Sequence, residues 1–174
     1  MSTFLRMTSV AATAATLALT AAPSIAATST SVSANPQAQA HARILRPLSL
    51  VSKQDLDLGT IALGQGTFTT TVGIGMDGTW TCDATKVTCS GTHQVATYTV
   101  AGTNNRTVTV AVSNVSMTSG ANTLLLTVDA PATVNLGATG TAGVDFNIGG
   151  SVDLSDSTPD GVYTGTFDVT ADYQ

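Results

Sequence analysis

The chain has 174 residues, enough for one ordinary domain with a hydrophobic core and too few for two. Its formal net charge is −5, and its 6 Lys and Arg residues form no cluster. Nucleic acids and anionic membrane surfaces are therefore not expected as partners, because both are bound mainly through grouped Lys and Arg. All 11 acidic residues are Asp, and Thr, Val and Gly dominate, so the composition indicates an all-β protein.

The first 26 residues have the layout of a secretory signal peptide. Arg6 precedes an apolar core at residues 10–22, Pro23 breaks that core, and small residues lead to a predicted cleavage after Ala26. A membrane anchor is the alternative, but the core is short and rich in Thr and Ala for a span of about 30 Å. No later segment approaches ~18 continuous apolar residues. We therefore expect an exported chain with no transmembrane segment, placed in the periplasm, on the cell surface or outside the cell.

Residues 27–43 form a polar extension of small residues. Its apolar residues fall on alternate positions, namely Val32, Ala34, Pro36, Ala38, Ala40 and Ala42. Such alternation predicts an extended strand with one buried face. Most of these residues are Ala and would bury little surface, so a disordered linker is the alternative.

From residue 44 to residue 174, short alternating stretches and turn signals follow one another. A strand is expected at 44–50, another at 56–63 with a break at Gly59, and others at 68–74, 79–82, 87–89, 96–100, 108–112, 124–128, 134–136 and 163–173. Apolar residues also alternate at 146–148 and 152–154, on either side of a glycine pair. Asp77-Gly78 indicates a hairpin turn, and Gly149-Gly150 indicates a bulge or a sharp bend. No segment has a helical period. We therefore predict an antiparallel, immunoglobulin-like β-sandwich of eight to ten short strands over residues 44–174.

Cys82 and Cys89 would meet an oxidising compartment after export, where a pair of cysteines usually forms a disulfide. Free or metal-binding thiols are the alternative, but the spacing is not Cys-x-x-Cys and only His93 is near. We predict a disulfide, which would stabilise the fold by roughly 2.5 kcal/mol through the short loop it closes.

We expect neither enzymatic activity nor a cofactor. The chain has no Glu and no Gly-x-Ser-x-Gly motif, and His93 is the single histidine after the extension, so no catalytic nucleophile with its base can be recognised. Asp55 and Asp57 share one face of a strand, as a catalytic carboxylate pair might need, but the same spacing is ordinary for a solvated strand.

Two features keep ligand binding open. Asp153, Asp156 and Asp160 fall in one stretch and could offer oxygen ligands to Ca²⁺, although Asp is also common in turns and no metal site is predicted. Trp80 lies between a turn and the cysteine pair, where an exposed ring could contact a sugar or another ligand. The alternative is that Trp80 packs on the disulfide.

Three stretches resemble a secreted bacterial family known as domain of unknown function 4402. They are residues 42–50 together with 55–61, residues 91–100, and residues 161–167. The resemblance covers essentially all of residues 42–174, and the name of the family implies no activity. Neither the cysteines nor Trp80 are among the positions that carry it.

The C-terminus is also similar to that of chaperone–usher pilins and of spore-coat-U-type subunits. Pilins end in an alternating strand with a penultimate Tyr and a Gly fourteen positions from the end, which here are Tyr173 and Gly161. Tyr163, Phe167 and Val169 share the alternation. The resemblance implies an incomplete sandwich whose groove is filled by the N-terminal extension of a neighbouring subunit. Residues 27–43 would then be the donor strand, and the partners would be further copies of the chain and a periplasmic chaperone and usher.

The sequence therefore favours an exported structural subunit of the cell surface, similar to a fimbrial subunit. The alternative is a secreted module that binds carbohydrate or matrix through Trp80 and the adjacent loop. A polymer needs the extension to engage a neighbour, whereas a binding module does not.

Overall fold

The computed structural model describes residues 31–174, so the predicted signal peptide, residues 1–26, lies outside the described residues. The chain divides into an N-terminal unit that ends at Ala42 and a second unit, Arg43–Gln174. Residues 31–42 are all exposed, and none of them belongs to a helix or a strand. The alternating residues of the extension therefore form no strand within this single chain.

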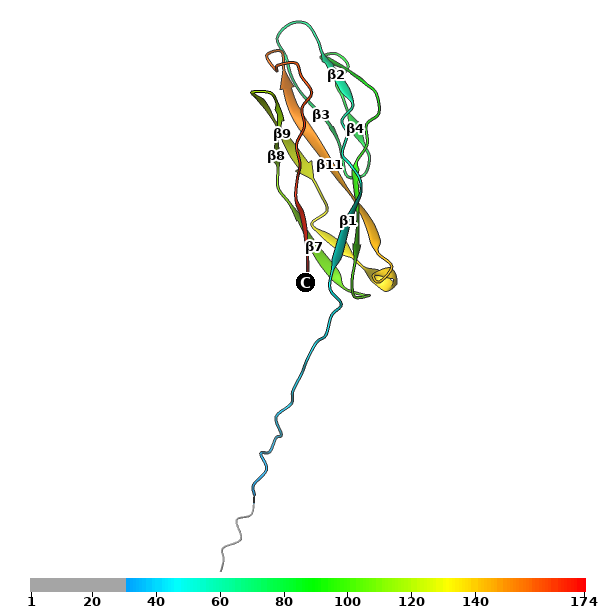
Figure 1. The fold of residues 1–174 in the computed structure, drawn as a ribbon, viewed down its shortest axis with the longest axis vertical. Helices are drawn as coiled ribbons and strands as arrows, with labels where there is room; N and C mark the ends of the chain where they lie inside the picture. Colours follow the sequence, from blue (N-terminus) through cyan, green and yellow to red (C-terminus); the bar gives the residue numbers. More distant parts are fainter. Residues whose placement is uncertain (1–30) are drawn as a thin grey trace, which may run out of the picture. The chain divides into compact units, whose positions relative to one another are not determined.

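The second unit consists almost entirely of β-strands (Figure 1). The strands of the described residues are β1 (Ser49–Gln54), β2 (Thr60–Leu63), β3 (Thr69–Ile74), β4 (Trp80–Thr81), β5 (Val87–Ser90), β6 (Ala96–Ala101), β7 (Thr107–Val112), β8 (Val115–Ser119), β9 (Asn122–Asp129), β10 (Thr133–Asn135), β11 (Val144–Ser155) and β12 (Val169–Tyr173). The helical element among these residues is η1 (Gly137–Thr139), a single 3₁₀ turn. No helix of the described chain has the length and apolar character to cross a membrane.

All strand pairs are antiparallel, and the predicted all-β sandwich is confirmed. In one half of the unit, the sheet β1-β6-β11 is packed against the sheet β10-β7-β12 through a shared core. In the other half, β11 lies between β3 and β9, with β4 and β8 beyond them, and the separate pair β2-β5 packs against this sheet. The strand β11 runs through both halves.

The long strand β11 changes partners at its glycine pair. Residues 144–148 pair with β6, whereas residues 150–155 pair with β3. The strand is continuous through Gly149-Gly150, where a bulge or a sharp bend was expected. A Cβ at Gly149 would collide with the backbone of Ile74 and Gly75, so glycine is required there by close packing of two chain segments.

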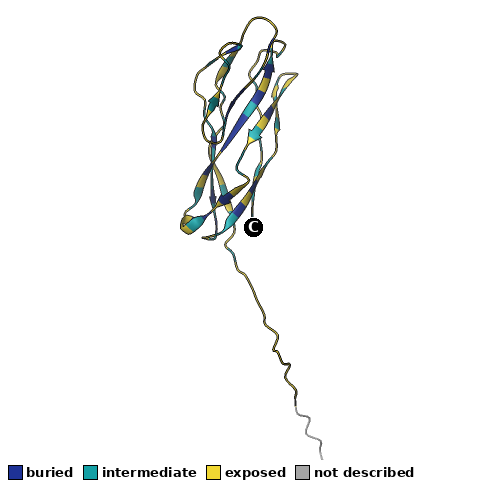
Figure 2. Cartoon of the chain, turned by 180° about the vertical axis from the view of Figure 1, so that it is seen from behind, coloured by how far each residue is buried: buried dark blue, intermediate teal, exposed yellow. Residues whose placement is uncertain are grey.

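The core has two hydrophobic clusters, one in each half. The closed cluster, between the two three-stranded layers, is formed by Ala96, Val100, Val108, Val110, Val134, Leu136, Phe146 and Ile148. The open cluster, in the half with β2 and β5, is formed by Phe68, Val72, Val87, Leu126, Val152 and Leu154. Figure 2 shows the buried stretches gathered along β11, which contributes to both clusters.

Two expected strands have different bounds in the structure. The strand expected at 44–50 begins only at Ser49, because Pro47 has no N–H to donate to a neighbouring strand, and it continues to Gln54. The strand expected at 163–173 is regular only from Val169. The described residues hold twelve strands rather than eight to ten, and β8 was not expected.

Candidate functional site: a groove between two strand edges

A groove with a volume of about 1120 Å³ opens in the half of the unit that holds the open cluster. Residues 55–63, which include β2, form its early wall, and residues 156–167, which connect β11 to β12, form its late wall. No strand pairing joins the two walls within the described residues. In Figure 1, β2 and the segment that follows β11 lie at the end of the unit that is distant from the C-terminus.

The floor of the groove is apolar and incompletely covered. Leu126, Val152 and Leu154 lie beneath it and are buried by the surrounding strands. A second set of apolar side chains lines the groove and stays only half-buried, namely Leu56, Leu58, Ile61, Met117, Leu124 and Phe167. Covering this second set would remove further apolar surface from water, which stabilises by roughly 25 cal/mol per Å².

The late wall has an unpaired backbone edge. The Thr164 N–H donates to the Thr118 carbonyl oxygen at 3.0 Å, and the Thr118 N–H donates to the Thr164 carbonyl oxygen at 2.8 Å. In an antiparallel ladder, the backbone groups of the adjacent residues point to the opposite side. Within the described residues, those of Tyr163 and Gly165 make no backbone hydrogen bond. The late wall can therefore accept a further strand on its side away from β8.

The early wall is similarly paired on one side. Asp57 and Gln94 exchange two backbone hydrogen bonds of 2.9 and 2.8 Å, whereas Leu56 and Leu58 make none in the described chain. After Gly59, where φ is +69°, the wall continues as β2, which pairs only with β5. The groove thus separates two strand edges that each have a neighbour on the far side and none across the gap.

The charged side chains that line the groove are all acidic. They are Asp55 and Asp57 of the early wall and Asp156 and Asp160 of the late wall, and no Lys, Arg or His joins them. None of the four forms an ion pair among the described residues. One Asp57 carboxylate oxygen accepts a hydrogen bond of 2.7 Å from the Gly59 N–H, which supports the turn into β2.

The five residues of the pilin-like ending fall in two places. Gly161, Tyr163 and Phe167 line the groove, whereas Val169 and Tyr173 belong to β12. A Cβ at Gly161 would collide with the Ser119 side chain at the end of β8, so glycine lets the late wall lie close to that strand. The Tyr163 hydroxyl donates to the Pro159 carbonyl oxygen at 2.8 Å and thereby ties the two parts of the wall together.

Tyr173 acts at the opposite end of the unit from the groove. Its hydroxyl accepts a hydrogen bond of 2.7 Å from the Thr103 N–H and donates one of 2.8 Å to the Arg46 carbonyl oxygen. The same ring lies against Gly102, where a Cβ would collide with the hydroxyl. The penultimate residue therefore fixes the segment by which the chain enters the sandwich.

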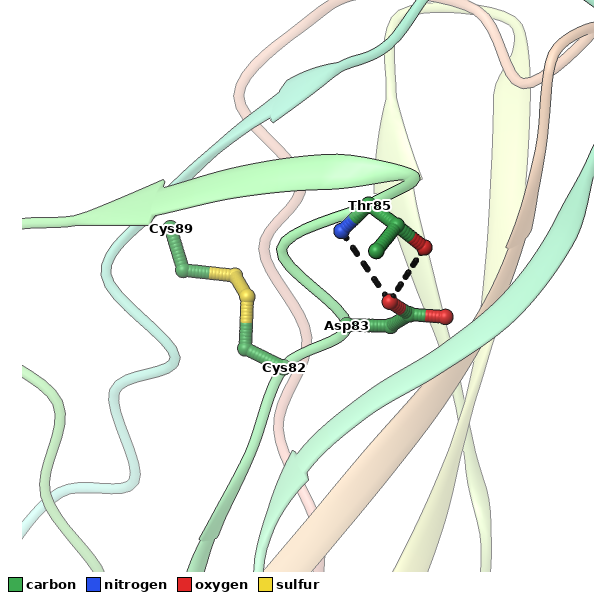
Figure 3. The surroundings of a disulfide bond; sticks show 4 residues. All are labelled: Cys82, Asp83, Thr85 and Cys89. Atoms are coloured by element: carbon green, nitrogen blue, oxygen red, sulfur yellow. Dashed lines mark hydrogen bonds between the residues drawn. A yellow bond between two sulfur atoms is a disulfide. The ribbon is translucent and has the colours of Figure 1, made fainter.

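The predicted disulfide is confirmed, and it connects two different sheets. Cys82 follows β4, which pairs with β3, and Cys89 lies in β5, which pairs with β2 (Figure 3). Between them, one Asp83 carboxylate oxygen accepts hydrogen bonds from the Thr85 hydroxyl and the Thr85 N–H, at 2.7 and 3.0 Å. These bonds, the hydroxyl foremost, hold the pKa of Asp83 below its ordinary value of 3.8. The bridge thus fastens β5, and with it the β2 edge of the groove, to the main sheet.

Trp80 is half-buried and packs against the open cluster, as do both cysteines. One face of its ring stacks on the exposed His93 ring, with the ring centroids 4.3 Å apart and 19° between the planes. The stacked histidine occupies a face that a sugar ring would need. Neither residue lines the groove.

The other candidate ligands do not converge. One Asp153 carboxylate oxygen accepts a hydrogen bond of 2.5 Å from the Thr71 hydroxyl, on the strand beside it, whereas Asp156 and Asp160 lie in the late wall. Within residues 31–174, no three Asp, His or Cys side chains are grouped in a way that could hold a metal ion.

Several residues that line the groove were singled out from the sequence, but the groove itself was not predicted. Leu124 and Leu126 were expected on one strand face, and Asp156 and Asp160 were considered only as calcium ligands. Met117 belongs to β8, which the sequence did not reveal. The alternation of Leu56, Leu58, Tyr163 and Phe167 marked one apolar face on each wall. It carried no sign that the two walls would face each other unpaired.

Comparison with protein-family models finds a match to a family described as "Domain of unknown function (DUF4402)", over residues 48–173. Neither the curated proteins nor the solved structures include a match. The matched range contains both hydrophobic clusters, both walls of the groove, the disulfide and Tyr173. The chain therefore belongs to the DUF4402 family.

Proposed function

We propose that this chain is an exported structural subunit of the cell surface, fimbria-like, which assembles when a strand from one copy enters the groove of another. The observation that carries the proposal is the groove itself, with an apolar floor between two strand edges that are unpaired toward each other. Strand addition would satisfy both edges with main-chain hydrogen bonds and would cover the half-buried floor.

An open groove of this kind is a hazard if nothing fills it. Unpaired strand edges beside exposed apolar surface invite aggregation, and proteins normally cover them. The N-terminal extension is a suitable occupant, because its apolar residues alternate with polar ones and its described part, residues 31–43, forms no strand within its own chain. Before assembly, a periplasmic chaperone acting with an usher would protect the same edges.

Deleting the extension tests the proposal. Among the described residues, the buried hydrophobic side chains lie from Phe68 to Leu154, and the second unit begins at Arg43, so a chain that starts at Arg43 keeps this core. We expect the chain from Ala27 to form SDS-resistant ladders or filaments, and the chain from Arg43 to stay monomeric, in size-exclusion chromatography with light scattering. A full-length variant with Ala38→Asp and Ala40→Asp should behave like the deletion. Equal assembly of all three chains would contradict strand exchange through the extension.

Export has its own test. The purified, exported protein should begin at Ala27 when its N-terminus is determined by mass spectrometry. A protein that retains Met1 and fractionates with the cytoplasm would contradict the proposal at its first step.

The second candidate function is a secreted module that binds carbohydrate or matrix. The observation that favours it is the half-buried ring of Trp80 at the surface, since Trp is enriched at binding interfaces, and His93 would have to leave the ring face on which it stacks. Trp80→Ala should then abolish retention on a polysaccharide column, with His93→Ala as the companion variant. Equal retention of variant and unmodified protein would remove this candidate.

A further inference from the structure

On the basis of the proposed function, we infer that the end of the groove formed by Asp156 and Asp160, called here the acidic entrance, receives Arg43 of a second copy. The inserted extension then runs antiparallel to the late wall. This arrangement sets the direction of the inserted strand, distinguishes a neighbour's extension from the chain's own, and makes assembly sensitive to salt.

The charges of the two partners are complementary. The groove is lined by four Asp side chains and by no basic residue. The chain from Ala27 to Gln54 contains no acidic residue, and within the extension the charged or titratable side chains are His41 and Arg43. These two lie at the C-terminal end of the extension, next to the point where it joins its own sandwich.

The fold determines which end of a neighbour's extension remains at the groove opening. Tyr173 holds Arg46 at the end of the unit that carries the C-terminus, so the extension leaves the sandwich there. The groove lies at the other end, where β2 and the segment that follows β11 are found (Figure 1). A neighbour's sandwich therefore has room only beyond the acidic entrance, because the inner end of the groove adjoins the half with the closed cluster.

The direction of the strand follows. The neighbour's Arg43 stays near its own sandwich, at the acidic entrance, and residues 42 to 32 extend inward along the late wall. The stretch 32–42 would span about 36 Å as a strand, at about 3.3 Å per residue, and the early wall, residues 55–63, about 30 Å. The alternating stretch is thus long enough to fill the groove without gaps.

The charged residues can define the register and direction of the inserted strand, which the apolar residues of the extension cannot. Its inward face is mostly Ala, which offers little contrast between one register or direction and another. The apolar surface gained belongs mainly to the floor, which any extended chain would cover. If the chain's own extension turned back into its own groove, it would enter from the inner end and place Arg43 near Asp55.

The test is a charge exchange in the full exported chain. We expect Arg43→Glu to slow assembly about tenfold at about 0.1 M NaCl, since attraction becomes repulsion, and Asp156→Lys with Asp160→Lys to do the same. Combining all three changes should restore most of the rate. At about 1 M NaCl, where the Debye length falls to about 3 Å, the differences should largely disappear.

Two matched variants make the position specific. Asp55→Asn removes one charge at the inner end of the groove, and Asp172→Asn removes one from the exposed face of β12. Asp172→Asn, which lies outside the groove, should assemble within about twofold of the unmodified chain, because surface charges distant from Arg43 contribute little. Asp55→Asn tests the opposite direction of insertion, because an Arg43 bound at the inner end would lose its partner there. Thermal unfolding of each variant checks that its sandwich is intact.

The outcomes separate the inference from the function on which it rests. If assembly needs the extension but has the same rate in every charge variant, the acidic entrance is wrong and strand exchange remains supported. Loss of assembly with Asp55→Asn alone would place Arg43 at the inner end and overturn the direction. Both proposals fail if the unmodified chain assembles under no condition and the chain from Arg43 does not bind a synthetic peptide of residues 30–46.

Discussion

The two hydrophobic clusters are similar in composition and differ in how they are covered. The closed cluster lies between two three-stranded layers, and Leu136 and Ile148 within it have no exposed surface. The open cluster is covered by the short pair β2-β5 and by a late wall with one bridge to β8, so Leu124 and Met117 beside it stay half-buried. The same alternating apolar pattern thus gives a closed core where a three-stranded layer covers it and a groove where two strand edges are unpaired toward each other.

Replacing a leucine by alanine should reveal the largest difference in stability between the two clusters. Leu136→Ala empties a fully buried site and should lower the free energy of unfolding by about 3–4 kcal/mol. Leu124→Ala removes a side chain that water already reaches and should cost about 1 kcal/mol. Urea denaturation of the chain from Arg43 measures both.

The same two leucine substitutions can be compared again after a peptide has filled the groove. With a saturating synthetic peptide of residues 30–46, the cost of Leu124→Ala should rise, whereas that of Leu136→Ala should stay constant. A cost for Leu124→Ala that equals that of Leu136→Ala without peptide would mean that the open cluster is already complete.

The disulfide should be the next largest contribution, and it acts on the open half. Replacing Cys82 and Cys89 together by Ser releases β5 from the main sheet and should cost roughly 2.5 kcal/mol, from the short loop that the bridge closes. Hydrogen exchange should increase in β2 and β5 while β7 and β12 keep their protection. Uniform loss of protection would show that the two halves unfold as one unit.

The hydroxyl of Tyr173 should matter at the closed end. Tyr173→Phe removes one hydrogen bond to Arg46 and one from Thr103, at a half-buried site, and should cost about 1–2 kcal/mol. Tyr163→Phe is the matched control, since its single hydrogen bond to Pro159 is exposed and should contribute less. Thermal melting distinguishes the two, and equal effects would contradict an anchoring role for Tyr173.

Lowering the pH should have the smallest effect on the stability of the fold, and the lowered pKa values define the direction of that effect. Hydrogen bonds from the Lys53 and Thr99 side chains hold the pKa of Asp145 below its ordinary value of 3.8, and the backbone and side chain of Thr79 do the same for Asp77. A lowered pKa in the folded state contributes stability above about pH 3.8, which is lost as the pH falls through the folded pKa. NMR titration should give midpoints below 3.8 for both carboxyls, and Lys53→Ala should raise that of Asp145 only.

Much of the fold could be predicted from local pattern. The alternation at 96–100 and 108–112 matches β6 and β7, and Asp77-Gly78 does form the turn between β3 and β4, where Gly78 has a φ of +85°. These features are local, because side-chain alternation sets which face of a strand is buried and glycine sets where the backbone can turn.

The candidate site could be predicted only in part. The pilin-like ending brought attention to Gly161, Tyr163 and Phe167, which line the groove, but the alternation suggested one strand to the C-terminus. In the structure, that strand divides at Val169 into a paired end and an unpaired wall. Alternation is identical in both parts, since it records burial of a face and is silent on the pairing of an edge.

By itself, therefore, the sequence determined the all-β class, most of the strands and turns, the cysteine pair, and the membership that residues 48–173 now establish. Only the tertiary structure decided that β11 serves two halves, that Tyr173 holds Arg46, and that four Asp side chains line an open groove. The physical reason is that strand edges are completed by segments distant in the chain. The local sequence pattern does not show whether a strand edge has a partner, and this can be determined only from the assembled sheets.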